Sequence, residues 1–115
     1  ESLKVRMRRA GHILGAATLG ISDGRTEIVF SGDLGRPNDP IMYPPEPVDD
    51  ADYIVLESTY GERLHEAVDP AQQLADVIRR TIGRGGTLVI PAFAVGRTQE
   101  ILYAIAQLKA ALKAR

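Results

Sequence analysis

The sequence contains no cysteine among its 115 residues. This excludes disulfide bonds and thiolate metal sites and agrees with a reducing compartment, so we expect a cytoplasmic protein. No apolar run approaches the roughly 18 residues that a membrane span needs, so no membrane partner is expected. The chain opens with ESLKVRMRR, which has neither an initiator methionine nor the apolar core of a signal peptide. We therefore expect a start inside a longer sequence.

Net charge is also nearly absent, at −1. A protein with this balance has no bulk attraction to nucleic acid, so any basic surface must be local. The contents of 44% hydrophobic and 25% charged residues are typical of one folded globular domain. The local basic clusters are Arg6, Arg8 and Arg9, and Arg79, Arg80 and Arg84.

The first half of the chain has the pattern of antiparallel strands. Apolar and basic residues alternate over residues 3–8, which predicts a half-buried strand. A second strand over 16–21 and a returning strand over 26–31 flank Asp23-Gly24, a two-residue hairpin signal. Residues 36–52 hold five of the seven prolines and are expected to form an ordered surface loop.

The second half mixes apolar runs with helical patterns. The runs at 53–56 and 87–90 predict strands covered on both faces of a sheet. Asp69-Pro70 is a typical helix start and Gly83 a typical end, and another helix is expected from Gly96. The predicted fold class is α/β with a mixed sheet. The expected apolar stripes are Leu74, Val77, Ile78, Thr81 and Ile82 in the first helix, and Ile101, Ala104, Ile105, Leu108 and Leu112 in the second.

Three residues are candidates for chemistry at strand ends. His12 lies in AGHILGAA, where it is either a buried imidazole or a ligand exposed beside small residues. Asp33 in FSGDLGRP is either a turn aspartate or a carboxylate able to bridge two metal ions. Glu57 ends an apolar strand, where it is either solvated or held at a ligand site.

Two further residues carry weaker signals. Arg97 opens the last helix, where free N–H groups and a guanidinium would suit a phosphate, although a solvated arginine is the simpler interpretation. His65 lies in a polar loop and indicates nothing alone. With two histidines, no cysteine, and no HxHxDH or HExxH cluster, the chain cannot complete a dinuclear metal site by itself.

The order of four motifs resembles a known family. AGHILGAA, SGDLGR, LESTYGERLH and IPAFAVGRTQEIL, over residues 3–108, resemble the metallo-β-lactamase-fold nucleases of the β-CASP group, in their RNA-processing branch. The resemblance implies that His12 binds zinc, that Asp33 bridges two zinc ions, and that Glu57 orients a later histidine that protonates the leaving group. It matches AFAVGRTQE to the first strand–helix unit of the β-CASP domain, and we assign no individual residue of this segment to catalysis.

The resemblance also implies a domain organisation. Residues 1–61 would belong to a partial metallo-β-lactamase αββα sandwich, and residues 62–115 would form the first strand–helix units of a β-CASP domain. The HxHxDH motif would precede the chain, and further histidines would follow it. The chain alone is therefore expected to bind zinc weakly and to cleave nothing.

The function implied is a zinc-dependent ribonuclease, exo- or endonucleolytic, that hydrolyses RNA phosphodiester bonds through a metal-bound hydroxide. One alternative is a non-catalytic β-CASP-type scaffold or RNA-binding subunit. Another is an unrelated α/β module that binds phosphate at the helix start of Arg97. Exposed strand edges would also favour homo-oligomers or domain swapping.

Overall fold

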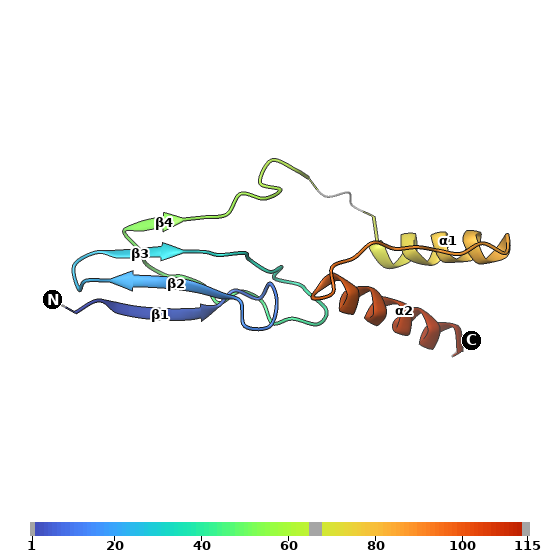
Figure 1. The fold of residues 1–115 in the computed structure, drawn as a ribbon, viewed down its shortest axis with the longest axis horizontal. Coiled ribbons are helices and arrows are strands. Elements are labelled where there is room, and N and C mark those ends of the chain that lie inside the picture. Colours follow the sequence, from blue (N-terminus) through green and yellow to red (C-terminus); the bar gives the residue numbers. More distant parts are fainter. Residues whose placement is uncertain (1, 65–67, 114–115) are drawn as a thin grey trace. The chain divides into compact units, whose positions relative to one another are not determined.

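The computed structural model describes residues 2–64 and 68–113, which fall into two compact units, Glu1–Glu62 and Arg63–Arg115. The first unit holds a four-stranded sheet, and the second holds two helices (Figure 1). The predicted α/β class with a mixed sheet is confirmed. Neither described helix combines the length and apolarity needed to cross a membrane.

The sheet consists of β1 (Lys4–Arg9), β2 (Ala17–Ser22), β3 (Glu27–Phe30) and β4 (Tyr53–Val55), in that spatial order. The first three strands pair antiparallel, whereas β4 runs parallel to β3. Parallel neighbours need a crossover because the chain must return to the same end of the sheet. Here the proline-rich residues 36–52 supply most of it without helix or strand, as predicted.

The turn between β2 and β3 differs from the prediction. Its central residues are Gly24 and Arg25, not Asp23 and Gly24, because the Asp23 backbone N–H bonds to the Thr26 carbonyl at 3.3 Å. Oδ1 of Asp23 accepts the N–H groups of Arg25 and Thr26, both at 2.8 Å. These bonds lower the pKa of Asp23, the one from Thr26 most. Gly24 has a φ of +93°, which favours glycine.

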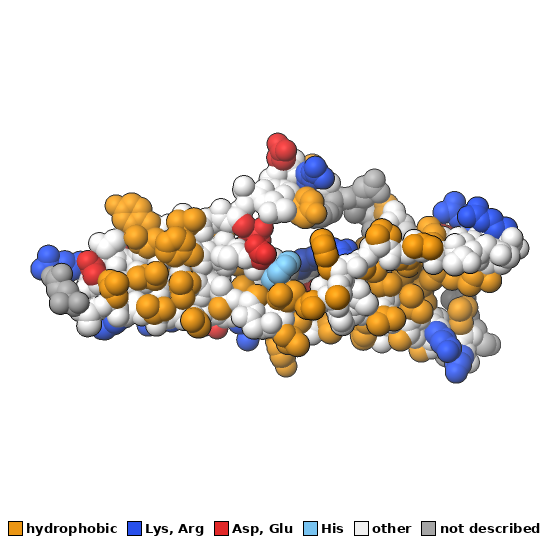
Figure 2. Space-filling view, in the orientation of Figure 1, with side chains coloured by type: hydrophobic (Ala, Val, Ile, Leu, Met, Phe, Trp, Pro, Cys, Tyr) orange, Lys and Arg blue, Asp and Glu red, His pale blue; other side chains and the backbone are white. Residues whose placement is uncertain are grey.

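One face of the sheet is apolar and exposed, so the prediction of a half-buried β1 and a covered β4 is wrong for this chain. Residues directly opposite in the ladder share a face, and Met7, Leu19, Phe30 and Val55 form one such row. Met7 is 74% exposed and Val55 53%. Hydrophobic side chains cover much of the sheet face seen in Figure 2. The reason is that the described residues of the first unit supply no second layer for this face.

The opposite face holds the small core of the first unit. Val29 and Thr18 are buried there, and Ala10 is fully buried just beyond β1. The proline-rich loop is fastened to the end of β1 at Arg9. The carbonyl of Arg9 accepts the N–H of Glu46 at 2.9 Å, and its guanidinium lies 5.4 Å from the ring centroid of Tyr43. The loop is therefore ordered, as predicted.

Helix α1 (Pro70–Gly83) begins as predicted. The Asp69 side chain accepts the N–H of Ala71 at 2.9 Å, and Pro70 occupies the first turn. The predicted end is wrong: Gly83 is still helical, and Gly85, with a φ of +70°, terminates the helix. The N–H of Gly85 bonds to Ile82 and that of Gly86 to Thr81, the pattern of a Schellman motif. Leu74, Val77 and Ile78 are half-buried and Thr81 is buried, as predicted. Ile82 is exposed instead, and the buried Ala75 lies outside the predicted stripe.

The predicted strand over 87–90 is absent, and these residues have no assigned helix or strand. A strand needs a partner for its backbone groups, and the described part of the second unit offers none. Helix α2 (Arg97–Lys113) follows, starting one residue after the predicted Gly96. Ile101, Ala104 and Leu108 of its predicted stripe are half-buried, whereas Leu112 is exposed.

Candidate metal centre

His12 lies at the surface, on the loop that follows β1. The loop is closed by a hydrogen bond from the Ala10 N–H to the Ala16 carbonyl at 3.0 Å. Gly11 has a φ of +72° and packs so closely on the crossover that a Cβ there would lie 2.6 Å from the Tyr43 carbonyl oxygen. The His12 side chain is 47% exposed, which excludes the interpretation as a buried core imidazole.

Asp33 lies on the loop after β3, and a backbone contact holds this loop against that of His12. Gly11 and Leu34 form an isolated antiparallel bridge, and the Gly35 N–H donates to the Ala10 carbonyl at 2.8 Å. A Cβ on Gly35 would overlap the Gly11 backbone. The glycines of the AGH and DLG motifs therefore permit an approach that no side chain would allow.

This approach brings together two of the predicted metal ligands. Nε2 of His12 lies 3.9 Å from Oδ2 of Asp33, and the Asp33 side chain is 77% exposed. Imidazole nitrogen and carboxylate oxygen are both zinc donors. No group of three or more His, Cys, Asp or Glu residues in the described parts of the chain is arranged to hold a metal ion. The described residues thus place one imidazole nitrogen and one carboxylate oxygen side by side, and the prediction that they bind zinc stays a prediction.

Glu57 is the third predicted residue, and the structure connects it to the same loop. One carboxylate oxygen of Glu57, Oε1, accepts the N–H of Leu34 at 2.6 Å. Its own N–H donates to Oγ of Ser31 at 3.0 Å. Glu57 is half-buried rather than solvated, and its charge is partly compensated by this backbone donor. It therefore holds the residue that follows Asp33.

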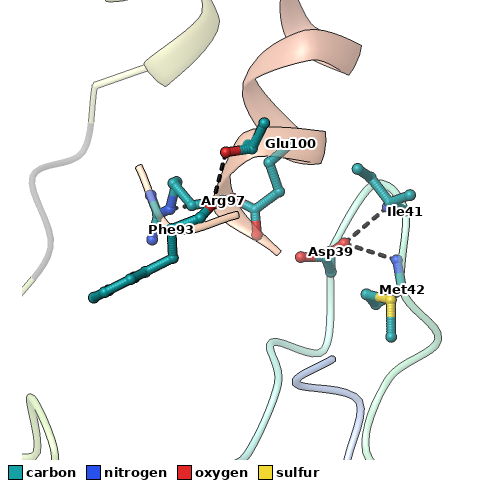
Figure 3. A network of polar contacts seen from close by, with 7 residues as sticks. Asp39, Ile41, Met42, Phe93, Arg97 and Glu100 are labelled. Atoms are coloured by element: carbon teal, nitrogen blue, oxygen red, sulfur yellow. Dashed lines mark hydrogen bonds and ion pairs between the residues drawn. The ribbon is translucent and has the colours of Figure 1, made fainter. Parts of the chain in front are cut away.

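Arg97 lies in the second unit, at the first position of α2, with 56% of its side chain exposed. Its Nε is 3.7 Å from a carboxylate oxygen of Glu100 (Figure 3). The same figure shows Asp39 of the first unit accepting the N–H groups of Ile41 and Met42 in a tight turn. The prediction that Arg97 binds substrate stays a prediction. His65 lies outside the described residues.

The sequence patterns missed two residues of this region. Ser31 and Thr18 are buried hydroxyl residues, 4% and 3% exposed, and the Thr18 hydroxyl donates to the Ser31 carbonyl at 3.1 Å. Ser31 is the first residue of the SGD motif, but nothing in the sequence pattern distinguishes its hydroxyl or that of Thr18 from other polar side chains of the sheet. A buried hydroxyl is retained where a specific hydrogen bond compensates its desolvation.

Three curated proteins are similar to most of this chain. It is 37% identical over 111 residues to an RNase J-like protein of Methanocaldococcus jannaschii, covering 91% of the chain and 26% of that protein. It is 38% identical over 104 residues to the endoribonuclease YSH1 of Yarrowia lipolytica, covering 89% and 13%. It is 39% identical over 95 residues to cleavage and polyadenylation specificity factor subunit 3-I of Arabidopsis thaliana, covering 81% and 14%. No profile of a known protein family matches the chain.

These similarities place the chain in the class of metallo-β-lactamase-fold nucleases. Within that class, the chain belongs to the β-CASP group of RNA-processing enzymes. The resemblance in its four motifs is thereby confirmed. The chain spans about a quarter of the length of the Methanocaldococcus protein and less of the other two relatives.

Proposed function

We propose that the chain is a segment of a ribonuclease that hydrolyses RNA phosphodiester bonds at a zinc site. The observation that carries the proposal is the 3.9 Å separation of His12 Nε2 and Asp33 Oδ2 on two exposed loops. Family membership supports it, because the similar proteins bear ribonuclease names. The proposal concerns the whole protein, since two ligands do not make a complete catalytic zinc site.

The donor pair fits the proposed metal. Two donor atoms about 2.0 to 2.2 Å from one tetrahedral zinc ion lie about 3.3 to 3.6 Å apart. The observed separation of 3.9 Å is a few tenths of an ångström wider, a difference that rotation of two exposed side chains would close. Both side chains are largely open to solvent, so neither is committed to packing in a core. The backbone beneath them is fixed by the Gly35 and Leu34 hydrogen bonds.

Each residue then has a defined role. A zinc pair, when bound, would lower the pKa of a coordinated water and offset charge that develops on the phosphate. His12 would hold one ion, and the Asp33 carboxylate would hold both. Glu57 would keep the Asp33 loop in place through Leu34 and offer its second oxygen to a proton donor. Arg97 would contact an RNA phosphate when not paired with Glu100.

We also propose the finer domain assignment. Residues 1–61 would be part of a metallo-β-lactamase sandwich, and residues 62–115 would begin the β-CASP domain. The separation of the chain into compact units at residues 62 and 63 supports this assignment. The exposed apolar face of the sheet supports it too, because a sandwich supplies a layer that covers such a face.

The proposal is tested by cleavage of labelled RNA by the whole protein, with and without a zinc chelator. We expect activity to be lost on chelation, restored by zinc, and lost in Asp33→Ala. Asp50→Ala is the matched control, because Asp50 is an exposed acid of the same unit. Binding of RNA without cleavage by a folded wild-type protein would instead support the scaffold alternative.

A further inference from the structure

Ser31 is a buried serine next to the candidate metal centre. The proposed function assigns it no role. Ser31 is the first residue after β3 and is 4% exposed. Its hydroxyl donates to the Gly32 carbonyl at 2.7 Å and accepts the N–H of Glu57 at 3.0 Å. Its own N–H donates to the Val55 carbonyl at 2.9 Å. Ser31 therefore joins the ends of β3 and β4 through both backbone and side chain.

The bond from the Ser31 N–H to the Val55 carbonyl is the last backbone bond of the β3–β4 ladder, and the Ser31 hydroxyl bonds where that ladder has ended. The β3–β4 ladder stops at the pair Phe30 and Val55, and Gly32 then turns the chain away with a φ of +58°. Beyond that point no strand backbone is available to receive the Glu57 N–H. The Ser31 hydroxyl oxygen accepts this N–H instead, so Glu57 leaves the sheet with its backbone donor hydrogen-bonded.

A second buried hydroxyl fixes Ser31 from the other side. The β2–β3 ladder ends at the pair Leu19 and Phe30, and the adjacent Thr18 bonds to the Ser31 carbonyl through its side chain instead. Thr18 is 3% exposed, so its hydroxyl has no access to bulk water. Buried hydrogen bonds of this kind have one geometry in which all partners are satisfied.

The bonds close a ring around Asp33. Ser31 holds the backbone of Glu57, the Glu57 carboxylate holds the N–H of Leu34, and Leu34 is three residues from Ser31 in the chain. Asp33 lies inside this ring, with its backbone fixed on both sides and its carboxylate exposed. The ring leaves the side chain free to bind an ion while restricting where it points.

We propose that Ser31, supported by Thr18, is a positioning residue that holds Asp33 in register with His12. The inference rests on the proposed function, since it gives Asp33 a metal to hold. Outer partners of metal ligands typically change metal affinity by about 10- to 100-fold when removed. Ser31→Ala removes the acceptor for Glu57 while leaving the Asp33 and His12 side chains unchanged.

The test measures zinc affinity of the whole protein, by titration against a chelator, together with kcat and KM for RNA. Ser31→Ala is expected to bind zinc roughly tenfold more weakly and to lower kcat with little change in KM. Thr18→Val, which keeps the shape and removes the hydroxyl, is expected to act in the same direction, and Thr18→Ser to restore wild-type values. Thr81→Val is the control, because it alters a buried threonine of the other unit.

The outcomes are distinguishable. Wild-type zinc affinity and kcat in a folded Ser31→Ala would overturn the inference, while loss of activity in Asp33→Ala would leave the proposed function intact. If Ser31→Ala does not fold, the pair Thr18→Val and Thr18→Ser decides in the same way. A wild-type protein that neither binds zinc nor cleaves RNA would overturn the proposed function and this inference together.

Discussion

Gly35 and Gly11 approach so closely that a side chain on Gly35 would overlap the Gly11 backbone. The contact sits between the loops of His12 and Asp33 and carries the Gly35–Ala10 hydrogen bond. Because the obstacle is backbone, no rotation of a neighbouring side chain can relieve it. The glycines of the two motifs are therefore explained by the geometry that unites the donors.

Gly35→Ala should accordingly separate the two loops. We expect a destabilisation of about 1–3 kcal/mol, the usual range for overpacking, and weaker zinc binding. Thermal unfolding and zinc titration of the whole protein measure the two effects. Gly83→Ala is the matched control, since Gly83 is helical with open space around its Cβ position, and it should gain roughly 0.5–1 kcal/mol. Equal behaviour of the two variants would contradict the explanation.

Asp23 should make the β2–β3 turn sensitive to acid. Its folded pKa is lowered by the N–H groups of Thr26 and Arg25, so the carboxylate stabilises the fold fully above its ordinary pKa of 3.8. That contribution is lost as the pH falls through the lowered folded value. The melting temperature of Asp23→Ala should therefore lie below that of wild type by a constant gap above pH 3.8, and the gap should narrow below it. A gap independent of pH would show that the charge has no role.

Asp69→Ala should weaken α1 by about 1 kcal/mol, because the N–H of Ala71 loses its acceptor. Asp69→Ser keeps an oxygen at this position and should recover most of the loss. Helical circular dichroism during thermal unfolding measures both variants. Identical melting of the alanine and serine variants would mean that the cap does not stabilise this helix.

The exposed sheet face should make the 115-residue chain associate with itself. Met7 and Phe30, 74% and 40% exposed, lie in the same row of that face. We expect light scattering to show a mass that rises with concentration, and Met7→Lys with Phe30→Lys to suppress the rise. Val89→Lys, an exposed apolar position in the other unit, should leave it unchanged. A monomer at all concentrations would contradict the prediction.

The sequence predicted the elements whose signals are local. The hairpin, the Asp69 cap and the amphipathic helices depend on residues within a few positions of one another, and all were found. The prediction of a strand over 87–90 was wrong because a strand needs a neighbouring strand to pair with, and a local sequence pattern does not show whether one is present. The end of α1 was misplaced because both Gly83 and Gly85 are suitable, and only the backbone shows which has a positive φ.

For the candidate site too, the sequence predicted what local motifs encode and missed what depends on contacts between distant residues. The motifs indicated His12, Asp33 and Glu57, but their spacing says nothing of a 3.9 Å approach between two loops. That approach depends on Gly35 meeting Gly11, a contact between residues far apart in sequence. Ser31 and Thr18 were missed because a buried hydroxyl resembles any other polar residue of a strand end until its partners are known.

The most direct test of the account is a double-mutant cycle for zinc affinity in the whole protein, using His12→Ala, Asp33→Ala and the double variant. If the two side chains hold the same metal centre, each single change should weaken binding roughly tenfold or more, and the double variant should lose much less than the product of the two losses. Zinc affinities that are unchanged, or losses that simply multiply, would contradict a shared site.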